Sequence, residues 1–307
     1  MIREALGTLK YKALDCWPYV MEEVKAKRLR EEFRLRISEL APIQSAGRPS
    51  IEIHMLCGKY HVDMGIFAGW SFMRFLKNAS LYIHSDGTLG EQDATIIRMT
   101  LPTAVIITST EADKRVKETV AAIAPKLCEW RRSNFFAAQL IDMNLFGEFD
   151  RFLFLDADIL CFLDPVELRT ALMVEKPVFR WAQDLRSSYV APVPVLRKMT
   201  QLHVPEAVNL GPMVVPRLGE KDFRYLEHLF QIFQADPMIN MKLSWAPQTF
   251  YAICACRSPG SHPFSPSYAL TRGRTAEEAI IRHYVSIPAI RPRFFTEGLP
   301  KIFEGLQ

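Results

Sequence analysis

A run of apolar residues that ends in two aspartates constrains the fold of this chain more than any other stretch. Residues 152–155 are Phe-Leu-Phe-Leu, and Asp156 and Asp158 follow directly. An unbroken apolar run of this length is typical of a short strand buried on both faces of a mostly parallel sheet. The sequence therefore predicts an α/β domain in which this strand is central and ends at Asp156.

The two aspartates are candidate ligands of a cation. In open α/β sheets, ligands bind beyond the carboxyl ends of the strands, which is where Asp156 and Asp158 are expected. Two neighbouring carboxylates repel each other unless a cation lies between them, and a hard divalent ion that also contacts substrate phosphates is the natural partner. The alternative is that one aspartate only caps a helix that begins near Pro165, because Asp-x-Asp is a common tripeptide.

Composition excludes several classes of protein. The chain has 307 residues, 49% hydrophobic and 23% charged, which is typical of a globular protein. Its longest uncharged stretch, residues 243–256, is too short to cross a bilayer, and the first 30 residues show no secretory signal. The net charge of +4 is not that of a nucleic-acid binder. Six scattered cysteines indicate reduced, buried thiols, and hence a cytoplasmic protein.

The N-terminal segment differs from the rest of the chain. Residues 1–48 hold ten Lys or Arg and seven Asp or Glu. Their pattern predicts two helices, Ile2–Cys16 and Val20–Leu40, with an apolar stripe too thin for a core helix. We expect an appendage with a linker over residues 1–48 and a main domain over residues 49–307. Contact of this helical segment with an anionic membrane surface or with a partner is left open.

The main domain alternates strand and helix patterns. Strands are expected at 51–57, 80–84, 104–108, 152–155, 178–182, 209–215 (after a turn) and 280–286. Helices are expected at 62–77, 91–98, 111–123, 133–146, 165–174, 220–235 and 247–256. This rhythm predicts a sheet with parallel strands and helices on both faces, and residues 257–273 are expected to form a loop.

Five features in this order resemble glycosyltransferase family 8, the glycogenin and lipopolysaccharide galactosyltransferase type. They are a strand, Asp156-Ala-Asp158, Asn209-Leu-Gly211, Gln248 and His283. The resemblance covers about residues 51–295. It implies the GT-A fold, a mixed and mostly parallel sheet. It also implies transfer of a sugar from a nucleotide sugar, with a UDP-sugar expected, to a glycan, lipid-linked sugar or protein acceptor.

The resemblance also assigns roles to residues. The metal ligands would be Asp156, Asp158 and His283, and the ion would be manganese or magnesium. Catalytic contacts with the sugar or the departing phosphate would come from Asp184, Asn209 and Gln248. The nucleotide would contact Cys57, Gly58, Tyr60, Asp156, Ala157 and Gly211. A divalent ion would stabilise the charge that grows on the departing nucleoside diphosphate, and a nitrogen ligand favours manganese.

The chain departs from the pattern of that family in three places. Pro247 precedes Gln248 where the family has aspartate, and Gln139 stands where the family has arginine. The C-terminal Gly-x-x-Lys-Pro-Trp segment of the family is absent, and Arg291-Pro-Arg293 offers the positive charge instead.

Two other functions remain open on the sequence. The departures leave room for a GT-A-like protein that binds a nucleotide sugar without catalysis. A haloacid-dehalogenase-type phosphatase is the third hypothesis, because Ser85-Asp-Gly-Thr-Leu89 looks like the tail of its signature. The match fails at the chemistry, since His84 holds the position of the aspartate nucleophile.

Overall fold

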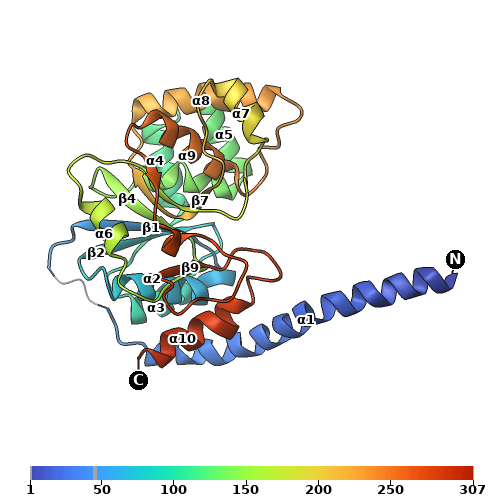
Figure 1. Ribbon diagram of the computed structural model, residues 1–307. Coiled ribbons are helices and arrows are strands. Elements are labelled where there is room, and N and C mark those ends of the chain that lie inside the picture. Colours follow the sequence, from blue (N-terminus) through green and yellow to red (C-terminus); the bar gives the residue numbers. More distant parts are fainter. Residues whose placement is uncertain (1, 44–46, 307) are drawn as a thin grey trace.

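The computed structural model describes residues 2–43 and 47–306, with side chains described from residue 19 onward. A seven-stranded sheet runs through the middle of the molecule, in the order β3-β2-β1-β4-β7-β6-β8, and a small sheet pairs β5 with β9 (Figure 1). The strands are β1 (Ile51–Cys57), β2 (Ala79–Ser85), β3 (Val105–Ile107), β4 (Arg151–Leu155), β5 (Ile159–Cys161), β6 (Arg180–Gln183), β7 (Val208–Pro216), β8 (His262–Pro263) and β9 (Ile281–His283).

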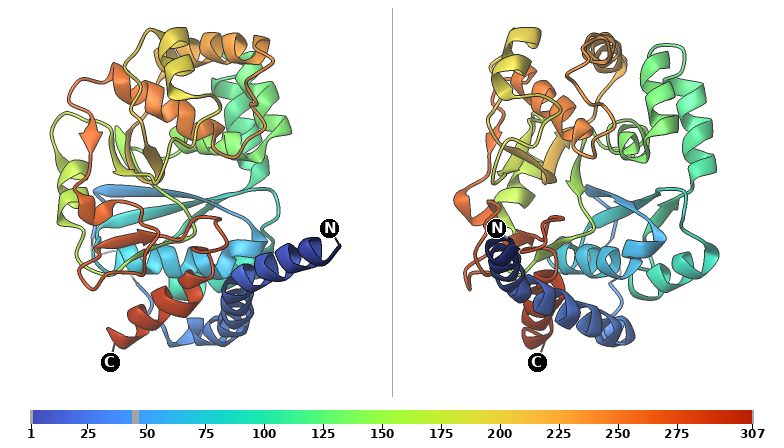
Figure 2. Two further views of the ribbon diagram at one scale, coloured as in Figure 1. Left: turned by 45° about the vertical axis from the view of Figure 1, so that its right-hand side comes forward. Right: turned by 90° about the vertical axis from the view of Figure 1, so that its right-hand side faces the viewer.

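Helices cover both faces of the large sheet (Figures 1 and 2). On one side lie α1 (Ile2–Leu35), α2 (Val62–Met73), α3 (Glu91–Thr100) and α10 (Leu299–Glu304). The other side carries α4 (Ser109–Thr119), α5 (Pro125–Ser133), α7 (Val193–Thr200), α8 (Glu220–Ala235) and α9 (Ala246–Arg257), while α6 (Val166–Met173) lies near one edge. Shorter helical segments are η1 (Arg36–Glu39), η2 (Lys59–His61), η3 (Phe135–Gln139), η4 (Asp142–Asn144), η5 (Pro266–Tyr268) and η6 (Phe294–Gly298).

The central strand is buried on both faces, as predicted. Successive side chains of a strand point to opposite faces. Accordingly, Leu153 and Leu155 belong to the core that includes α2, whereas Phe152 and Phe154 belong to the core that includes α8 and α9. Strands β1 to β4 are parallel to their neighbours in that half of the sheet, and only β7 runs antiparallel, between β4 and β6. The mixed, mostly parallel α/β sheet is therefore confirmed.

Several local predictions need correction. The helix expected over 133–146 is wrong, because α5 ends at Ser133 and two short 3₁₀ segments follow. Asn134 adopts an extended backbone, and its side chain accepts a hydrogen bond from the backbone N–H of Phe136, which starts a new segment. The turn expected at residues 209–211 is part of β7. The last strand is shorter than expected and pairs with β5, outside the large sheet.

The N-terminal segment forms one long helix, and the prediction of two helices is wrong. Helix α1 continues through Pro18 and extends away from the body of the molecule at its N-terminal end (Figure 1). Its second half packs on the domain through the buried Ala26 and Phe33, and the buried Ile37 of η1 and Leu40 directly after η1 continue this face. The apolar stripe is therefore not thin there. In the described part of the chain, no helix is long and apolar enough to cross a membrane.

Both apolar and ionic contacts hold this helix. The ring of Phe33 lies 6.4 Å from that of Phe67 in α2 and 5.3 Å from that of Phe303 in α10 (centroid distances). Arg30 forms two hydrogen bonds of 2.6 and 2.7 Å with the carboxylate of Asp63, a buried residue of α2. Because an unpaired buried carboxylate would be costly, this contact fixes where the helix lies. The division of the chain at residue 48 stays a prediction.

The thiols that the structure describes agree in part with the sequence. Cys57, Cys128, Cys161 and Cys254 are free and buried, as predicted, and Cys256 is free and half-buried. The sixth, Cys16, has a side chain outside the described residues.

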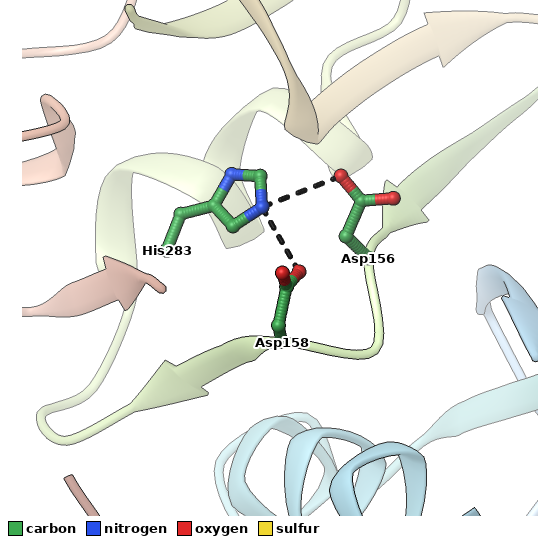
Figure 3. A group of neighbouring side chains, drawn as sticks. All are labelled: Asp156, Asp158 and His283. Atoms are coloured by element: carbon green, nitrogen blue, oxygen red, sulfur yellow. Dashed lines mark hydrogen bonds and ion pairs between the residues drawn. The ribbon is translucent and has the colours of Figure 1, made fainter. Parts of the chain in front are cut away.

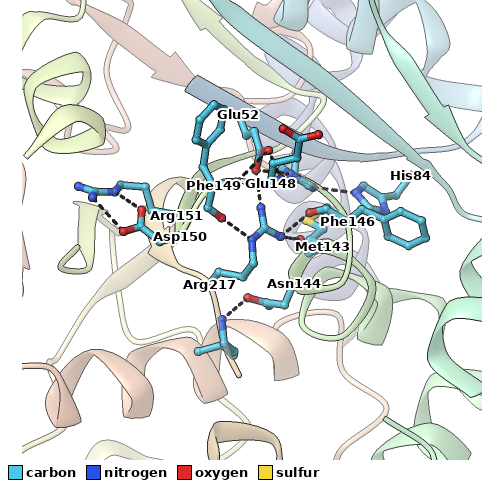
Figure 4. Close-up of polar contacts among 12 residues, drawn as sticks. Glu52, His84, Met143, Asn144, Phe146, Glu148, Phe149, Asp150, Arg151 and Arg217 are labelled. Atoms are coloured by element: carbon cyan, nitrogen blue, oxygen red, sulfur yellow. Dashed lines mark hydrogen bonds and ion pairs between the residues drawn. The ribbon is translucent and has the colours of Figure 1, made fainter. Parts of the chain in front are cut away.

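A buried polar network ties the central strand to its neighbours (Figure 4). Arg217, directly after β7, pairs with the buried carboxylate of Glu52 in β1 and donates to the carbonyl of Phe149 at 2.6 Å. The Glu52 carboxylate also accepts from the backbone N–H of Glu148 at 2.5 Å. Three segments that precede or flank β4 are thereby joined. The network fixes the strand from which Asp156 emerges.

We predict that Phe33→Ala lowers the free energy of unfolding by about 3 kcal/mol or more, because it opens a cavity between three elements. Urea unfolding measures the difference. Leu35→Ala is the control, because Leu35 lies two residues further along the same helix and is 81% exposed. This variant should change the free energy of unfolding by less than about 0.5 kcal/mol. Equal stability of the two variants would show that α1 is not held by this core.

We also predict a loss of stability in acid from two buried histidines. His54 and His84 are fully buried, with ring nitrogens 2.9 Å apart, and burial lowers the pKa of each well below 6.5. Below that pH the unfolded chain binds protons that the folded chain does not. The free energy of unfolding should therefore decrease as the pH is lowered, by about 1.4 kcal/mol per pH unit for each histidine.

The measurement is urea unfolding at a series of pH values between 6.5 and about 5. His84→Gln should make the slope of stability against pH shallower, since one of the two groups no longer titrates. His228→Gln, on an exposed position of α8, is the matched control and should keep the wild-type slope. Parallel curves for wild type and His84→Gln would contradict the assignment.

Candidate functional site

Three side chains meet where β4 ends (Figure 3). Asp156 follows β4, Asp158 precedes β5, and His283 is the last residue of β9. The pairing of β5 with β9 places Ile159 opposite His283, which brings the imidazole over both aspartates. His283 Nε2 lies 2.9 Å from Asp158 Oδ1 and 3.5 Å from Asp156 Oδ2. One potential ligand atom from each residue lies within 4.8 Å of the others, so the group could hold a metal ion.

The hydrogen bonds of His283 fit this role. Its Nδ1 lies 2.8 Å from Asn209 Oδ1, and the amide of Asn209 donates to Asp184 Oδ2 at 3.3 Å. An amide oxygen can only accept, so Nδ1 carries a proton. The neutral ring then presents the lone pair of Nε2 to the two carboxylates. Three acceptors facing one another need a positive charge between them, which a proton or a divalent cation can supply.

The ionisation of the three groups follows from this geometry. Burial raises the pKa of Asp156 to about 6, and the charge of Asp158 adds to the effect. Burial would also raise the pKa of Asp158, but His283 and Arg291 outweigh burial and hold it below the usual value. For His283, burial is outweighed by the charge and hydrogen bond of Asp158, which raise its pKa. Asp158 is thus the charged partner of the imidazole.

An arginine competes for Asp158. The guanidinium of Arg291 lies 3.0 Å from Asp158 Oδ2, on the opposite carboxylate oxygen from His283. Its Nε is buried without a hydrogen-bond partner in the described part of the chain. A positive charge at this distance repels a cation that binds Asp158. Arg291 therefore takes up part of the charge that a metal ion would otherwise neutralise.

A glycine allows two strands to approach at the site. A Cβ atom added to Gly211 in β7 would lie 2.6 Å from Asp156 Oδ2 and 2.9 Å from Ile159 Cδ1. The contact with Ile159 cannot easily be relieved, because that side chain is fully buried. Gly211 lies behind Asp156 and does not line the cavity described below. Its position indicates that it gives Asp156 room.

The site opens into a cavity of about 1080 Å³. It brings together most of the residues singled out from the sequence: Gly58, Tyr60, Asp156, Ala157, Asp158, Asp184, Asn209, Gln248 and His283. Tyr60 is 69% exposed at its edge. Cys57 is buried and does not line it, and burial raises the pKa of this thiol. The roles of these residues stay predictions.

Both the oxygen and the nitrogen of the Gln248 side-chain amide form hydrogen bonds with the backbone. Its Oε1 accepts from the N–H of Leu210 at 3.0 Å, and its Nε2 donates to the carbonyl of Ser188 at 2.9 Å. The side chain thereby joins β7 to the loop after β6. These contacts give Gln248 a role in positioning the backbone. A sugar hydroxyl that contacts Gln248 would share an amide atom that already has a backbone partner.

Sequence reasoning missed several residues that line the cavity. Asp86 lies beside Gly58, where an added Cβ would come within 2.0 Å of its carboxylate. Both residues follow the carboxyl ends of adjacent parallel strands, a signal that could have paired them. The other residues come from segments that the pattern did not connect with the site: Tyr19, Phe135, Phe136, Arg186, Trp245 and Arg272.

Comparison with known proteins locates the fold. A scan against protein-family models finds no match, and a search of curated proteins finds none. Mouse xyloside xylosyltransferase 1 matches in structure with 14% identity and a TM-score of 0.52, over 76% of this chain and 96% of that one. The bifunctional glycosyltransferase WbbM matches with 11% identity and a TM-score of 0.52, over 84% of this chain and 51% of that one.

These similarities show that the chain shares the fold of GT-A glycosyltransferases, as the sequence predicted. At such low identity they show the fold alone.

We predict that Arg291→Gln strengthens the binding of Mn²⁺ to the protein without nucleotide by roughly five- to tenfold, because it removes a positive charge beside Asp158. Isothermal calorimetry with MnCl₂ measures it. Arg293→Gln is the matched control, since Arg293 also lines the cavity but lies 3.6 Å from Glu297. An unchanged or weaker Mn²⁺ affinity in Arg291→Gln would contradict the competition between Arg291 and the ion.

Proposed function

We propose that this protein is a metal-dependent glycosyltransferase of the family 8 type that moves a sugar from a nucleotide sugar, with a UDP-sugar as donor, to an acceptor. The observation that carries the proposal is the Asp156, Asp158 and His283 group at the end of the central strand, opening into a large cavity of a GT-A fold. Manganese fits two carboxylates and one imidazole, and magnesium is the alternative. When bound, the ion would neutralise the diphosphate of the donor as the glycosyl bond breaks.

The residues of the chain have distinct tasks in this proposal. Asn209 holds the proton of His283 on Nδ1 and so keeps Nε2 free as a ligand. Asp184 is bonded to Asn209 and to the N–H of Leu185 at 2.6 Å, which fixes its carboxylate at the cavity for hydroxyl groups of the donor sugar. An ionised carboxylate accepts such bonds strongly.

Arg291 has a second task once a cation takes over Asp158. Its guanidinium already lines the cavity, so a short displacement would bring it to the diphosphate. Guanidinium groups bind phosphate oxygens in pairs. Arg291 thus supplies the positive charge that the Gly-x-x-Lys-Pro-Trp segment provides in family 8. The nucleotide base would lie toward Gly58, Tyr60 and Asp86, where the parallel strands end.

We predict that UDP binds only together with Mn²⁺ and that Asp158→Asn abolishes this joint binding, because the variant removes the charge that offsets the cation. His283→Ala should weaken it less than Asp158→Asn, because water can replace a neutral ligand. Calorimetry with UDP, in Mn²⁺ and then in chelator, measures the affinity, and hydrolysis of UDP-sugars measures turnover. GDP serves as the comparison nucleotide.

Asp164→Asn is the matched control, since Asp164 pairs with Arg169 away from the cavity. Thermal unfolding checks that each variant is folded. Asp158→Asn should lose stability, because the carboxylate pairs with both His283 and Arg291. UDP affinity that is the same in chelator, or wild-type turnover in Asp158→Asn, would contradict the proposal. Metal-dependent binding without any turnover would favour a non-catalytic nucleotide-sugar binding protein instead.

A further inference from the structure

One wall of the cavity is not used by the donor in the proposed function. It combines aromatic and arginine side chains, and we call it the outer wall: Phe135, Phe136, Arg186, Trp245 and Arg272, all of which line the cavity. These residues come from η3, from the loop after β6, from the start of α9 and from the loop before β9.

Backbone contacts show that these segments lie side by side. The indole N–H of Trp245 donates to the carbonyl of Tyr189 at 3.1 Å, which joins α9 to the loop that carries Arg186. On the other side of this loop, the N–H of Leu270 donates to the carbonyl of Gln183 at 2.9 Å. Arg186 and Arg272 therefore lie on neighbouring stretches of backbone.

The aromatic part joins the same wall. Asn134, next to Phe135, donates from its amide to the carbonyl of Met241 at 3.2 Å, which ties η3 to the segment before α9. Phe135 is 49% exposed and Trp245 is 36% exposed, although both line a cavity. Exposed aromatic rings in a cavity are typical of ligand sites, and the apolar C–H face of a sugar ring packs well on them.

The two arginines have no counter-charge among the side chains that the structure describes. Neither Arg186 nor Arg272 forms an ion pair through its side chain with any residue in the described part of the chain, and both are exposed. The carboxylates that line the cavity are held elsewhere. Asp156 and Asp158 face His283, Asp184 bonds to Asn209, and Asp86 bonds to Thr88. Two unpaired guanidinium groups on adjoining segments fit a phosphate or a carboxylate.

We propose that the outer wall is the acceptor subsite and that the acceptor is an anionic saccharide. Its sugar ring packs on Trp245 and Phe135, and its phosphate or carboxylate pairs with Arg186 and Arg272. The proposal rests on the proposed transferase function, because it takes the part of the cavity at Asp158 and Arg291 as the donor site. The donor diphosphate belongs near Asp158 and Arg291, and it would leave the charges of the outer wall unpaired.

The test compares three saccharides that share the same sugar ring and differ only in the group at C6: methyl glucoside, its 6-phosphate and methyl glucuronide. Each is titrated by ligand-observed NMR, once with UDP and Mn²⁺ present and once without. We expect the phosphate, the glucuronide or both to bind at least about tenfold more tightly than the neutral glucoside, as charge-assisted bonds to arginine allow. The charged compound that binds more tightly identifies the source of the anion.

Variants separate the two parts of the wall. The double variant Arg186→Gln, Arg272→Gln should bind the charged saccharides no better than the neutral one, with UDP affinity unchanged. Trp245→Ala should weaken all three saccharides alike. Arg98→Gln, an exposed arginine of α3 outside the cavity, is the matched control and should behave as wild type. Circular dichroism shows whether each variant is folded.

Equal affinity of wild type for neutral and charged saccharides would overturn the proposal. Loss of UDP affinity in the double arginine variant would also overturn it, by assigning the two arginines to the donor. Failure of UDP to bind wild type would instead contradict the proposed function. The comparison of saccharides without UDP still decides whether the outer wall binds anionic sugars.

Discussion

The meeting of two carboxylates and one imidazole at the end of β4 is the constraint on which the rest of the site depends. Asp156, Asp158 and the Nε2 lone pair of His283 are all acceptors, so they can lie this close only with positive charge among them. Arg291 supplies part of that charge, and Asp158 raises the pKa of His283, which favours a second proton on its ring. A divalent cation is the natural replacement for both.

The fold around the site fixes this meeting in space. The Glu52 and Arg217 network holds the start of β4. The side chains of β4 pack alternately into the two apolar cores. The small sheet of β5 and β9 then carries Asp158 and His283 into register, while Gly211 leaves room for Asp156. The site thus lies on the short turn between β4 and β5, and the adjoining strands hold that turn in place.

The sequence alone predicted the features that depend on local residue pattern. The unbroken apolar run at 152–155 predicted a buried central strand, and the two aspartates beyond it marked the edge where the cavity lies. The approach of His283 could not be derived from pattern alone, because it depends on the pairing of β5 with β9 over a separation of more than a hundred residues. It entered the sequence interpretation only through the resemblance to a family.

Other features depended on tertiary contacts that no local pattern shows. Phe33 and Arg30 lie in a segment that looks like a solvated helix, and only Phe67, Phe303 and Asp63 turn one side of it into a core face. The helix predicted over 133–146 is replaced by short 3₁₀ segments, the first of which is capped by the side chain of Asn134. Arg291 was noted as a source of charge, but its contact with Asp158 required the folded C-terminal segment.

The central claim is that a divalent cation takes the place among Asp156, Asp158 and His283 that positive charge now fills. Anomalous X-ray diffraction at the manganese absorption edge, on crystals grown with Mn²⁺ and UDP, tests it most directly. The account predicts an anomalous peak bounded by these three side chains, with Arg291 moved from Asp158 to the diphosphate. A peak elsewhere, or UDP bound without manganese while Arg291 stays on Asp158, would contradict it.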